Sequence, residues 1–301
     1  MPKVVYISGP ESDMPATCAA EIRAGGIDLS CRECEGEAAT EAFAKDADLV
    51  WMRGPNRGLT GDVLRRLPRC RAIFRSGSGV DALPCAAAAE LGVAVLNTPE
   101  SISESVAEHA VSLLFAFVRR IPHYDRSVRA GEWEPPNGMD WHLTGRTLGL
   151  VGYGRIARTV EKMVAGFSMR VLHYDPYAPG STDLDELLAA SDFVSLHCPL
   201  TDETRGLIDA RRLALMKRGA VLVNTSRGPV VDEAALAAAL RSSHLGGAAL
   251  DVLVDEPPAP GNPLIGLDNV IVTPHVAAFS ADFEKNFWSC SSRKILDFFS
   301  K

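Results

Sequence analysis

The sequence of 301 residues contains no apolar run long enough to cross a membrane. A bilayer helix needs roughly 18 to 20 apolar residues, and the longest apolar stretch of note, residues 110–118, is far shorter. The N-terminus does not match a signal peptide, because it has one positive charge and the apolar run at residues 4–7 is too short for the hydrophobic region of such a peptide. We therefore expect a cytoplasmic protein without a membrane partner.

The sequence has fewer basic than acidic residues. The 31 lysines and arginines face 38 aspartates and glutamates, which gives a formal net charge of −7. A protein that binds nucleic acid through its phosphates needs the opposite balance, so no nucleic-acid partner is expected. The overall charge does not exclude an anionic substrate, because a pocket can be locally basic on an acidic protein.

The seven cysteines are odd in number and irregular in spacing, which does not fit a disulfide framework. Cys31 and Cys34 form one Cys-x-x-Cys pair, followed by Glu35 and Glu37. A zinc site would need two further ligands at motif spacing, and none stands nearby, so no metal is expected. The simpler interpretation is a pair of reduced thiols in a surface segment.

Short β-branched runs alternate with stretches rich in alanine and leucine, which indicates parallel sheets with helices on both faces. Hydrophobic residues make up 47% and charged residues 23%, and the length fits about two globular domains. The first third of the chain has predicted helices such as 61–67 and 84–90. The strands predicted there are residues 4–8, 48–52, 72–75 and 93–96.

A second series follows a long helix predicted over residues 101–119, with Ser101 as its N-cap and Glu104 completing a capping box. Six strands with intervening helices make one complete doubly wound unit. A final helix is predicted over residues 281–299. The sequence therefore predicts an α/β protein with doubly wound parallel sheets. The six strands are residues 148–151, 171–174, 193–196, 221–224, 248–252 and 270–273.

A glycine-rich turn follows the predicted strand 148–151. Gly152, Gly154 and Ala157 match the Gly-x-Gly-x-x-Gly/Ala fingerprint between a strand and a helix, where a pyrophosphate meets the helix N-terminus. Asp175 ends the next strand about twenty residues later, where a carboxylate binds the ribose hydroxyls of NAD and repels the 2′-phosphate of NADP. This pattern predicts NAD rather than NADP. In the alternative interpretation the glycines only form a turn and Asp175 caps a helix.

Three side chains suited to one chemistry follow three of the predicted strands. Arg227, Glu256 and His275 come after strands 221–224, 248–252 and 270–273, so they leave the same edge of one sheet. Arginine holds a carboxylate through two parallel hydrogen bonds. Histidine exchanges a hydroxyl proton near neutral pH, and a neighbouring glutamate orients its ring. Taken singly, each residue also has an ordinary interpretation, as a surface or strand-end residue.

The chain resembles the D-isomer-specific 2-hydroxyacid dehydrogenase family over nearly its whole length and in the family's order. One matching stretch is Arg-Ser-Gly-Ser-Gly-Val-Asp at residues 75–81. The other matching stretches are residues 97–99, 105–108, 144–157, 196–200 with Thr204, 223–232, 251–257 and 273–278.

The resemblance implies two Rossmann- or flavodoxin-like domains with the active site in the cleft between them. Residues 1–98 with 278–301 would form the substrate domain, and residues 99–277 the NAD-binding domain. Arg227, Glu256 and His275 would be the catalytic residues that exchange a proton and bind a 2-oxo or D-2-hydroxy acid, of phosphoglycerate, glyoxylate or hydroxypyruvate type. Asp251 would lie near the nicotinamide amide.

The resemblance also implies the binding residues. Backbone N–H groups of Ser76 and Gly77 would hold the substrate carboxylate together with Arg227 and His275. The cofactor contacts implied are Ser78, Val106, Gly152, Tyr153, Gly154, Arg155, Ile156, Asp175, His197, Cys198, Pro199, Thr204, Thr225, Ser226, Arg227, Asp251, His275 and Ala278.

Several features leave the substrate and the assembly open. Arg53, after strand 48–52, would either reach the far end of an acidic substrate or be a solvated strand-end residue. The helix 101–119 and the loop 134–138, between Trp133 and Trp141, resemble the family's dimer arm and predict a homodimer, although both tryptophans could simply pack locally. Departures from the family pattern at Ile102, Ala278, Phe279 and Lys294 concern the pocket rim and the hinge.

Two other functions fit the same pattern. An NAD-sensing corepressor would use the same cofactor site to control assembly with protein partners, although no interaction tail or low-complexity arm is seen in the sequence. An NADP-linked glyoxylate or hydroxypyruvate reductase would share the chemistry and differ in the cofactor.

Overall fold

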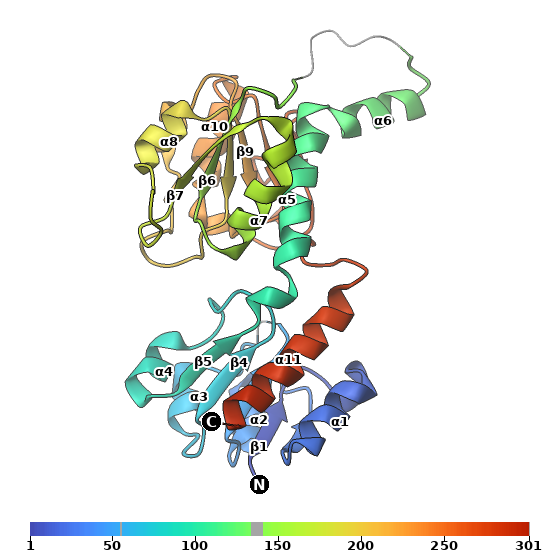
Figure 1. Cartoon of the computed structure of the whole chain (residues 1–301), viewed down its shortest axis with the longest axis vertical. Helices are drawn as coiled ribbons and strands as arrows, with labels where there is room; N and C mark the ends of the chain where they lie inside the picture. Colours follow the sequence, from blue (N-terminus) through green and yellow to red (C-terminus); the bar gives the residue numbers. More distant parts are fainter. Residues whose placement is uncertain (55, 134–140, 301) are drawn as a thin grey trace. The chain divides into compact units, whose positions relative to one another are not determined.

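The computed structural model of the chain describes residues 1–54, 56–133 and 141–300. The chain divides into two compact units (Figure 1). Unit 1 comprises Met1–Ser103 and Ser280–Lys301, and unit 2 comprises Glu104–Phe279. Within the described ranges, no helix combines the length and the apolar character that a membrane span requires.

Unit 1 is built on five parallel strands in the order β2-β1-β3-β4-β5. The central strand β3 is buried on both faces, because helices α2, α3 and α4 cover one face and α1 and α11 the other. The strands are β1 (Lys3–Tyr6), β2 (Asp28–Cys31), β3 (Leu49–Met52), β4 (Ala72–Arg75) and β5 (Ala94–Asn97). The helices are α1 (Ala16–Ala24), α2 (Gly36–Ala44), α3 (Gly61–Arg65), α4 (Cys85–Leu91) and α11 (Phe283–Phe299).

Sequence reasoning missed β2 and misplaced the cysteine pair. Leu29 is the one buried side chain of β2, so this edge strand has too weak an apolar pattern to predict. Cys31 ends β2, and Cys34 is buried in the cluster under α2 and α3. The expectation of a surface segment is therefore wrong for Cys34, whose pKa burial raises. Both thiols are free, as predicted.

Unit 2 has the predicted six parallel strands, in the order β11-β10-β9-β8-β6-β7. Alternate residues of its strands face two cores, so that α5 and α7 cover one face of the sheet and α8, α9 and α10 the other (Figure 1). The strands are β6 (Thr147–Val151), β7 (Arg170–Tyr174), β8 (Phe193–Leu196), β9 (Val221–Asn224), β10 (Gly247–Leu250) and β11 (Val270–Val272). The helices are α5 (Ser103–Val118), α6 (Ile121–Arg129), α7 (Arg155–Val164), α8 (Leu184–Ala190), α9 (Ala210–Leu215) and α10 (Glu233–Arg241).

The long helix begins later than its capping pattern predicts. A short 3-10 turn, Pro99–Ser101, precedes α5, and the Ser101 hydroxyl donates to the carbonyl of Thr98 at 2.7 Å. An N-cap hydroxyl would instead accept a hydrogen bond from an amide of the first turn. The role predicted for Ser101 is therefore wrong, because the turn begun by Pro99 separates this serine from the helix.

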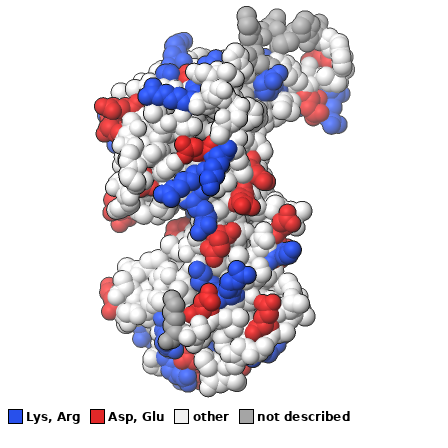
Figure 2. Space-filling model, in the orientation of Figure 1, with Lys and Arg blue, Asp and Glu red and all other residues white. Residues whose placement is uncertain are grey.

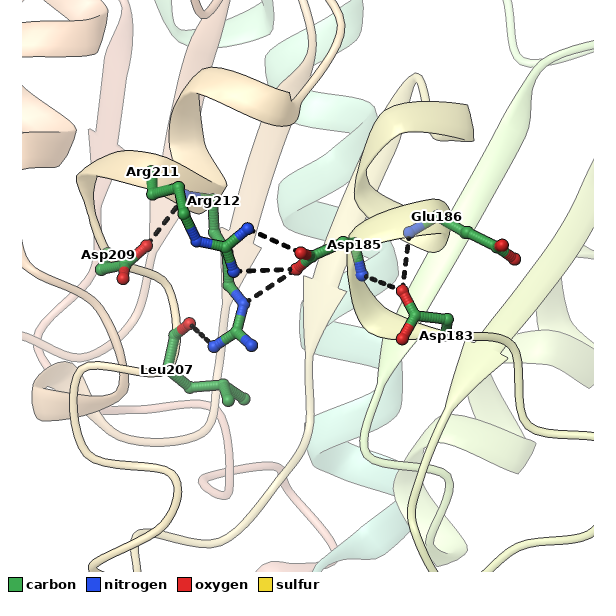
Figure 3. Close-up of polar contacts among 7 residues, drawn as sticks. All are labelled: Asp183, Asp185, Glu186, Leu207, Asp209, Arg211 and Arg212. Atoms are coloured by element: carbon green, nitrogen blue, oxygen red, sulfur yellow. Dashed lines mark hydrogen bonds and ion pairs between the residues drawn. The ribbon is translucent and has the colours of Figure 1, made fainter.

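A charged cluster joins α8 and α9 on the face of unit 2 that they cover (Figure 3). Asp185 on α8 accepts hydrogen bonds from both Arg211 and Arg212 on α9, which lowers the pKa of Asp185. The N-caps Asp183 and Asp209 accept amides of the two first turns. Basic and acidic side chains are also interspersed over the visible face of the molecule (Figure 2).

Candidate active site

The glycine-rich turn lies where β6 meets β8, the point at which the strand order of unit 2 reverses. Gly152 has φ of +85°, and a Cβ there would lie 2.5 Å from the backbone nitrogen of Cys198 after β8. Gly154 is the N-cap of α7, and a Cβ there would meet no atom within 4 Å. Ala157, fully buried, packs the helix against the sheet. Open space in front of free first-turn amides fits an anionic ligand such as a pyrophosphate.

Asp175 connects this turn with the segment that follows β7. Its Oδ2 accepts the amide of Tyr153 at 2.8 Å, and its Oδ1 accepts the amide of Tyr177 at 2.9 Å. Because an ionised carboxylate has about four acceptor positions, both oxygens keep capacity for a further donor. The carboxylate is therefore fixed in place at the end of β7 and partly exposed.

At the same edge of the sheet, two buried polar atoms after β8 and β9 have no hydrogen-bond partner among the described residues. They are His197 Nδ1, after β8, and Thr225 Oγ1, after β9. Burial lowers the pKa of His197 to about 4, so its ring is neutral at neutral pH, and its Nε2 lies 2.9 Å from Ser195 Oγ. Unpartnered buried polar atoms are rare in proteins, and they fit a ligand with hydrogen-bonding groups.

The other predicted cofactor positions lie on several elements. Arg155 and Ile156 begin α7, and Val106 is buried in α5. Cys198 is buried, and the exposed Pro199 accepts the Thr204 hydroxyl at 2.6 Å. Ser226 follows β9, and Ala278 is partly exposed in the segment after β11, whereas Ser78 belongs to unit 1.

His275 and Glu256 contact one another directly. His275 Nδ1 lies 2.6 Å from Glu256 Oε2, and Glu256 Oε1 accepts the amide of Leu253 at 3.1 Å. The second hydrogen bond keeps the carboxylate turned toward the ring. The pair is exposed, so the second ring nitrogen, Nε2, is able to exchange a proton with a bound molecule.

Arg227 follows the neighbouring strand β9. Its backbone carbonyl accepts Asn224 Nδ2 at 3.0 Å, and its Nη1 donates to the carbonyl of Ser226 at 2.7 Å. A Cβ on Gly228 would lie 2.0 Å from the carbonyl of Leu253, so only glycine lets the loops after β9 and β10 approach so closely. This contact brings the segment that carries Arg227 against the segment that ends in Glu256.

Asp251 has a role that sequence reasoning missed. Its buried carboxylate accepts the amides of Val276 and Ala277, at 3.0 and 2.9 Å, and the hydroxyl of Thr273. His109 Nε2 on α5 lies 3.4 Å from the same carboxylate. The Asp251 carboxylate therefore holds the two backbone amides that follow His275 and the side chain of Thr273 before it. The strand-end position of Asp251 was visible in the sequence, but its partner on α5 carried no signal.

The amides of Ser76 and Gly77 are already engaged within unit 1. The Ser76 amide donates to the carbonyl of Met52 at 3.0 Å, and the Gly77 amide donates to Thr98 Oγ1 at 2.9 Å. Ser76 therefore continues the β3–β4 ladder, which corrects the expectation that these two amides are free for a substrate carboxylate. The next residues, Ser78 and Gly79, are partly exposed, and their amides donate to no group in the described chain.

Arg53 is partly exposed and forms an ion pair within unit 1. Its Nη2 lies 2.6 Å from Glu284 Oε1 on α11, and its guanidinium lies over aromatic rings of the same helix. This ion pair joins residues 231 positions apart, which no local pattern in the sequence could indicate.

Helix α6 extends beyond the end of α5, away from the sheet of unit 2 (Figure 1), and none of its residues is buried. Ile121 and Val128 are half exposed, and Trp133 is 87% exposed, whereas Trp141 donates its amide to Val118 and packs near Phe193. Residues 134–138, assigned to a dimer arm, lie outside the described residues. A cavity of about 490 Å³ lies beside α6, lined among others by Phe117, Arg120, His123, Arg126, Trp141 and Ile271.

The comparisons with known proteins agree with this geometry. Residues 111–277 match the family model described as D-isomer specific 2-hydroxyacid dehydrogenase, NAD binding domain, which confirms the predicted NAD cofactor. A D-3-phosphoglycerate dehydrogenase of Methanocaldococcus jannaschii is 41% identical over 251 residues, 80% of this chain and 48% of that protein. A glyoxylate reductase of Korarchaeum cryptofilum is 41% identical over 239 residues, 74% of this chain and 71% of that protein.

A solved structure confirms the predicted fold class. The D-lactate dehydrogenase from Aquifex aeolicus, complexed with NAD and lactic acid, has a TM-score of 0.86 and 29% sequence identity. The match covers 99% of this chain and 95% of that chain. The chain spans about half the length of the phosphoglycerate dehydrogenase that it matches.

His197 is expected to make stability fall in mild acid. Its folded pKa of about 4 lies below the ordinary value of 6.5, so between these values the unfolded state binds a proton that the folded state does not. Stability is then full above pH 6.5 and is lost as the pH falls toward 4, by about 3 kcal/mol at most. Urea unfolding at pH 7 and pH 5 should show a smaller loss for His197→Gln than for the unaltered chain.

The exposed His142 provides the control for this experiment. His142→Gln should lose as much stability between the two pH values as the unaltered chain. An equal loss in His197→Gln would contradict the assignment.

Proposed function

The chain belongs to the D-isomer specific 2-hydroxyacid dehydrogenase family, and we propose that it interconverts a small 2-oxo acid and the corresponding D-2-hydroxy acid with NAD(H). The observation that carries this proposal is the contact of 2.6 Å between His275 and Glu256 in unit 2. An imidazole held by a carboxylate at the carboxyl edge of the sheet is suited to moving the proton of a carbinol.

His275 acts as the general acid in reduction. NADH, when bound, supplies the hydride. Glu256 holds the Nδ1 proton, so Nε2 gives its proton to the carbonyl oxygen of the substrate and takes it back in the reverse direction. Arg227 binds the carboxylate of the substrate through its guanidinium.

We assign substrate binding to unit 1 as well. The engaged amides of Ser76 and Gly77 move the expected carboxylate contact two residues along the chain, to the amides of Ser78 and Gly79. Two neighbouring N–H groups that donate to no group in the described chain form a suitable site for a carboxylate.

Replacing His275 by alanine should lower kcat by about 10² to 10⁴-fold, because general acid–base help is lost. NADH oxidation would be followed with glyoxylate, hydroxypyruvate, phosphohydroxypyruvate and pyruvate. NADH binding, measured by fluorescence, should persist in the variant because His275 is not part of the glycine-rich turn. The exposed His142→Ala is the matched control. Near-full turnover by His275→Ala would refute the assignment.

Asp175 supports a preference for NAD over NADP. Its carboxylate is held at the end of β7, next to the glycine-rich turn, where it accepts the Tyr153 amide. A fixed negative charge there favours two ribose hydroxyls and repels a 2′-phosphate.

Replacing Asp175 by alanine should weaken NADH binding about tenfold or more, because a hydrogen bond to a charged group is lost. NADPH binding should change less or improve, since the repulsion is removed. Fluorescence titration with both cofactors measures the ratio, and Asp202→Ala, at an exposed acid of unit 2, is the control. If the unaltered chain binds NADPH more tightly than NADH, the proposed preference is wrong.

We also propose that the chain forms a homodimer through α6 and the cavity beside it. Ile121 and Val128 are half exposed on α6, a helix with no buried residue, and the exposed Trp133 follows this helix. These apolar side chains are left uncovered in a single chain. A cytoplasmic location is proposed as well, and it is supported by the seven free cysteines.

Light scattering at micromolar concentration should give twice the chain mass of 32.3 kDa. Ile121→Glu with Val128→Glu should give the single mass, because two carboxylates in an apolar interface are unfavourable. Ile265→Glu is the control, since Ile265 is 52% exposed in unit 2 and lies outside α6. A monomeric unaltered chain would contradict the proposal.

A further inference from the structure

An ion pair occupies the carboxyl edge of the sheet in unit 1. Arg53 directly follows β3, and its Nη2 lies 2.6 Å from Glu284 Oε1 in the first turn of α11. Glu284 Oε2 accepts the indole N–H of Trp288 at 2.6 Å. Both carboxylate oxygens therefore have a donor, and the carboxylate is held at two points.

Arg53 is held as firmly as its partner. Its guanidinium carbon lies 5.9, 5.3 and 5.5 Å from the ring centroids of Phe283, Phe287 and Trp288. Its backbone amide donates to Ser8 Oγ at 3.1 Å. A cation over the faces of aromatic rings is stabilised by their quadrupoles. The side chain of Arg53 remains 33% exposed, so part of it is open to a solute.

The pair lies beside the segment proposed to bind the substrate carboxylate. Met52 pairs with Arg75 in the parallel register of β3 and β4, so Arg53 and Ser76 leave the sheet side by side, about 5 Å apart. Trp51 donates its indole N–H to Ser76 Oγ at 2.8 Å and contacts the ring of Trp288 at a centroid distance of 5.7 Å. Trp288, which lies under the Arg53 guanidinium, is thus connected through Trp51 to Ser76, the first residue of the loop after β4.

We infer that Glu284 is a specificity-determining residue that neutralises Arg53 and selects 2-oxo acids with an uncharged tail over phosphorylated ones. This inference rests on the proposed function. A lone arginine at this edge would attract the phosphate of a substrate such as phosphohydroxypyruvate. With Glu284 in place, the net charge of the pair is zero, and an approaching phosphate also meets a carboxylate that is held by Trp288.

The second hydrogen bond of Glu284 decides whether the pair persists. An exposed ion pair by itself contributes little to stability, so a phosphate dianion could displace a carboxylate held only by Arg53. Here the carboxylate also accepts the indole N–H of a buried tryptophan, and the guanidinium is ordered by three rings. Displacement would leave Glu284 close to the incoming dianion, and like charges at that distance repel.

Glu284→Gln tests the inference because it removes the negative charge and keeps the shape of the side chain. The ratio of kcat/KM for phosphohydroxypyruvate to kcat/KM for hydroxypyruvate should rise about tenfold, since Arg53 is then uncompensated. Adding Arg53→Ala to Glu284→Gln should cancel the rise. Glu90→Gln is the matched control, because Glu90 forms a similar exposed pair with Arg65 in unit 1, at 2.7 Å; it should leave the ratio unchanged.

Inorganic phosphate provides a readout that does not depend on turnover. Millimolar phosphate should raise the thermal unfolding temperature of Glu284→Gln more than that of the unaltered chain or of Glu90→Gln, at constant ionic strength. Glu284→Ala is the second variant and should behave in the same way if the glutamine variant does not fold.

The two readouts separate this inference from the proposed function. If 2-oxo acids are reduced but the ratio and the phosphate effect are the same in the Glu284 variants as in the unaltered chain, the inference is wrong and the proposed function stands. If no 2-oxo acid is reduced, the proposed function fails. If phosphate then also stabilises the Glu284 variants no more than the unaltered chain, the inference that Glu284 keeps phosphate from Arg53 is wrong as well.

Discussion

The buried carboxylate of Asp251 organises the segment that carries His275. It accepts two successive backbone amides, those of Val276 and Ala277, and the hydroxyl of Thr273. His275 itself has φ of +54°, a left-handed conformation that costs a non-glycine residue of order 1 kcal/mol or more. Such a conformation persists only when its surroundings determine it. Asp251 provides those surroundings, so the direction of the imidazole depends on a carboxylate that the solvent does not reach.

The sheet of unit 2 aligns the partners of His275. Asn224 pairs with Leu250 and Leu250 with Val272, so β9, β10 and β11 end at one level. The loops that follow are short up to the functional residues, since Arg227, Glu256 and His275 come within a few residues of these strand ends. Gly228 lets the first two loops touch, since any side chain there would collide with Leu253. Arg227 and His275 are 48 positions apart in the chain. The backbone hydrogen bonds of the sheet, rather than contacts between their side chains, thus place both at the same edge of unit 2.

The predictable features were those with a local cause. Strands β6, β8, β9 and β10 of unit 2 are buried on both faces, so their apolar runs stand out in the sequence. The turn at Gly152 has a sequence pattern because a Cβ there would strike Cys198. Features that depend on distant partners were missed or misplaced. The contact of His109 with Asp251 spans 142 positions, as their residue numbers show. The substrate role expected for the Ser76 amide rests on the family resemblance alone, and no local pattern indicates that the carbonyl of Met52 on β3 accepts this amide.

The same carboxylate chemistry is compatible with the anionic substrate that we propose for this acidic chain. The net charge of −7 is an average over the whole surface, whereas an anion responds to the cations within a Debye length that are not already compensated. Asp251 is saturated by amides and a hydroxyl, and Glu256 is directed at an imidazole, so neither opposes an anion as an unpaired acid would. Glu284 is the contrasting case, because its carboxylate compensates an arginine that could otherwise bind the anion. In this proposal, the choice of anion depends on which donors each carboxylate contacts, and not on the number of acidic residues in the chain.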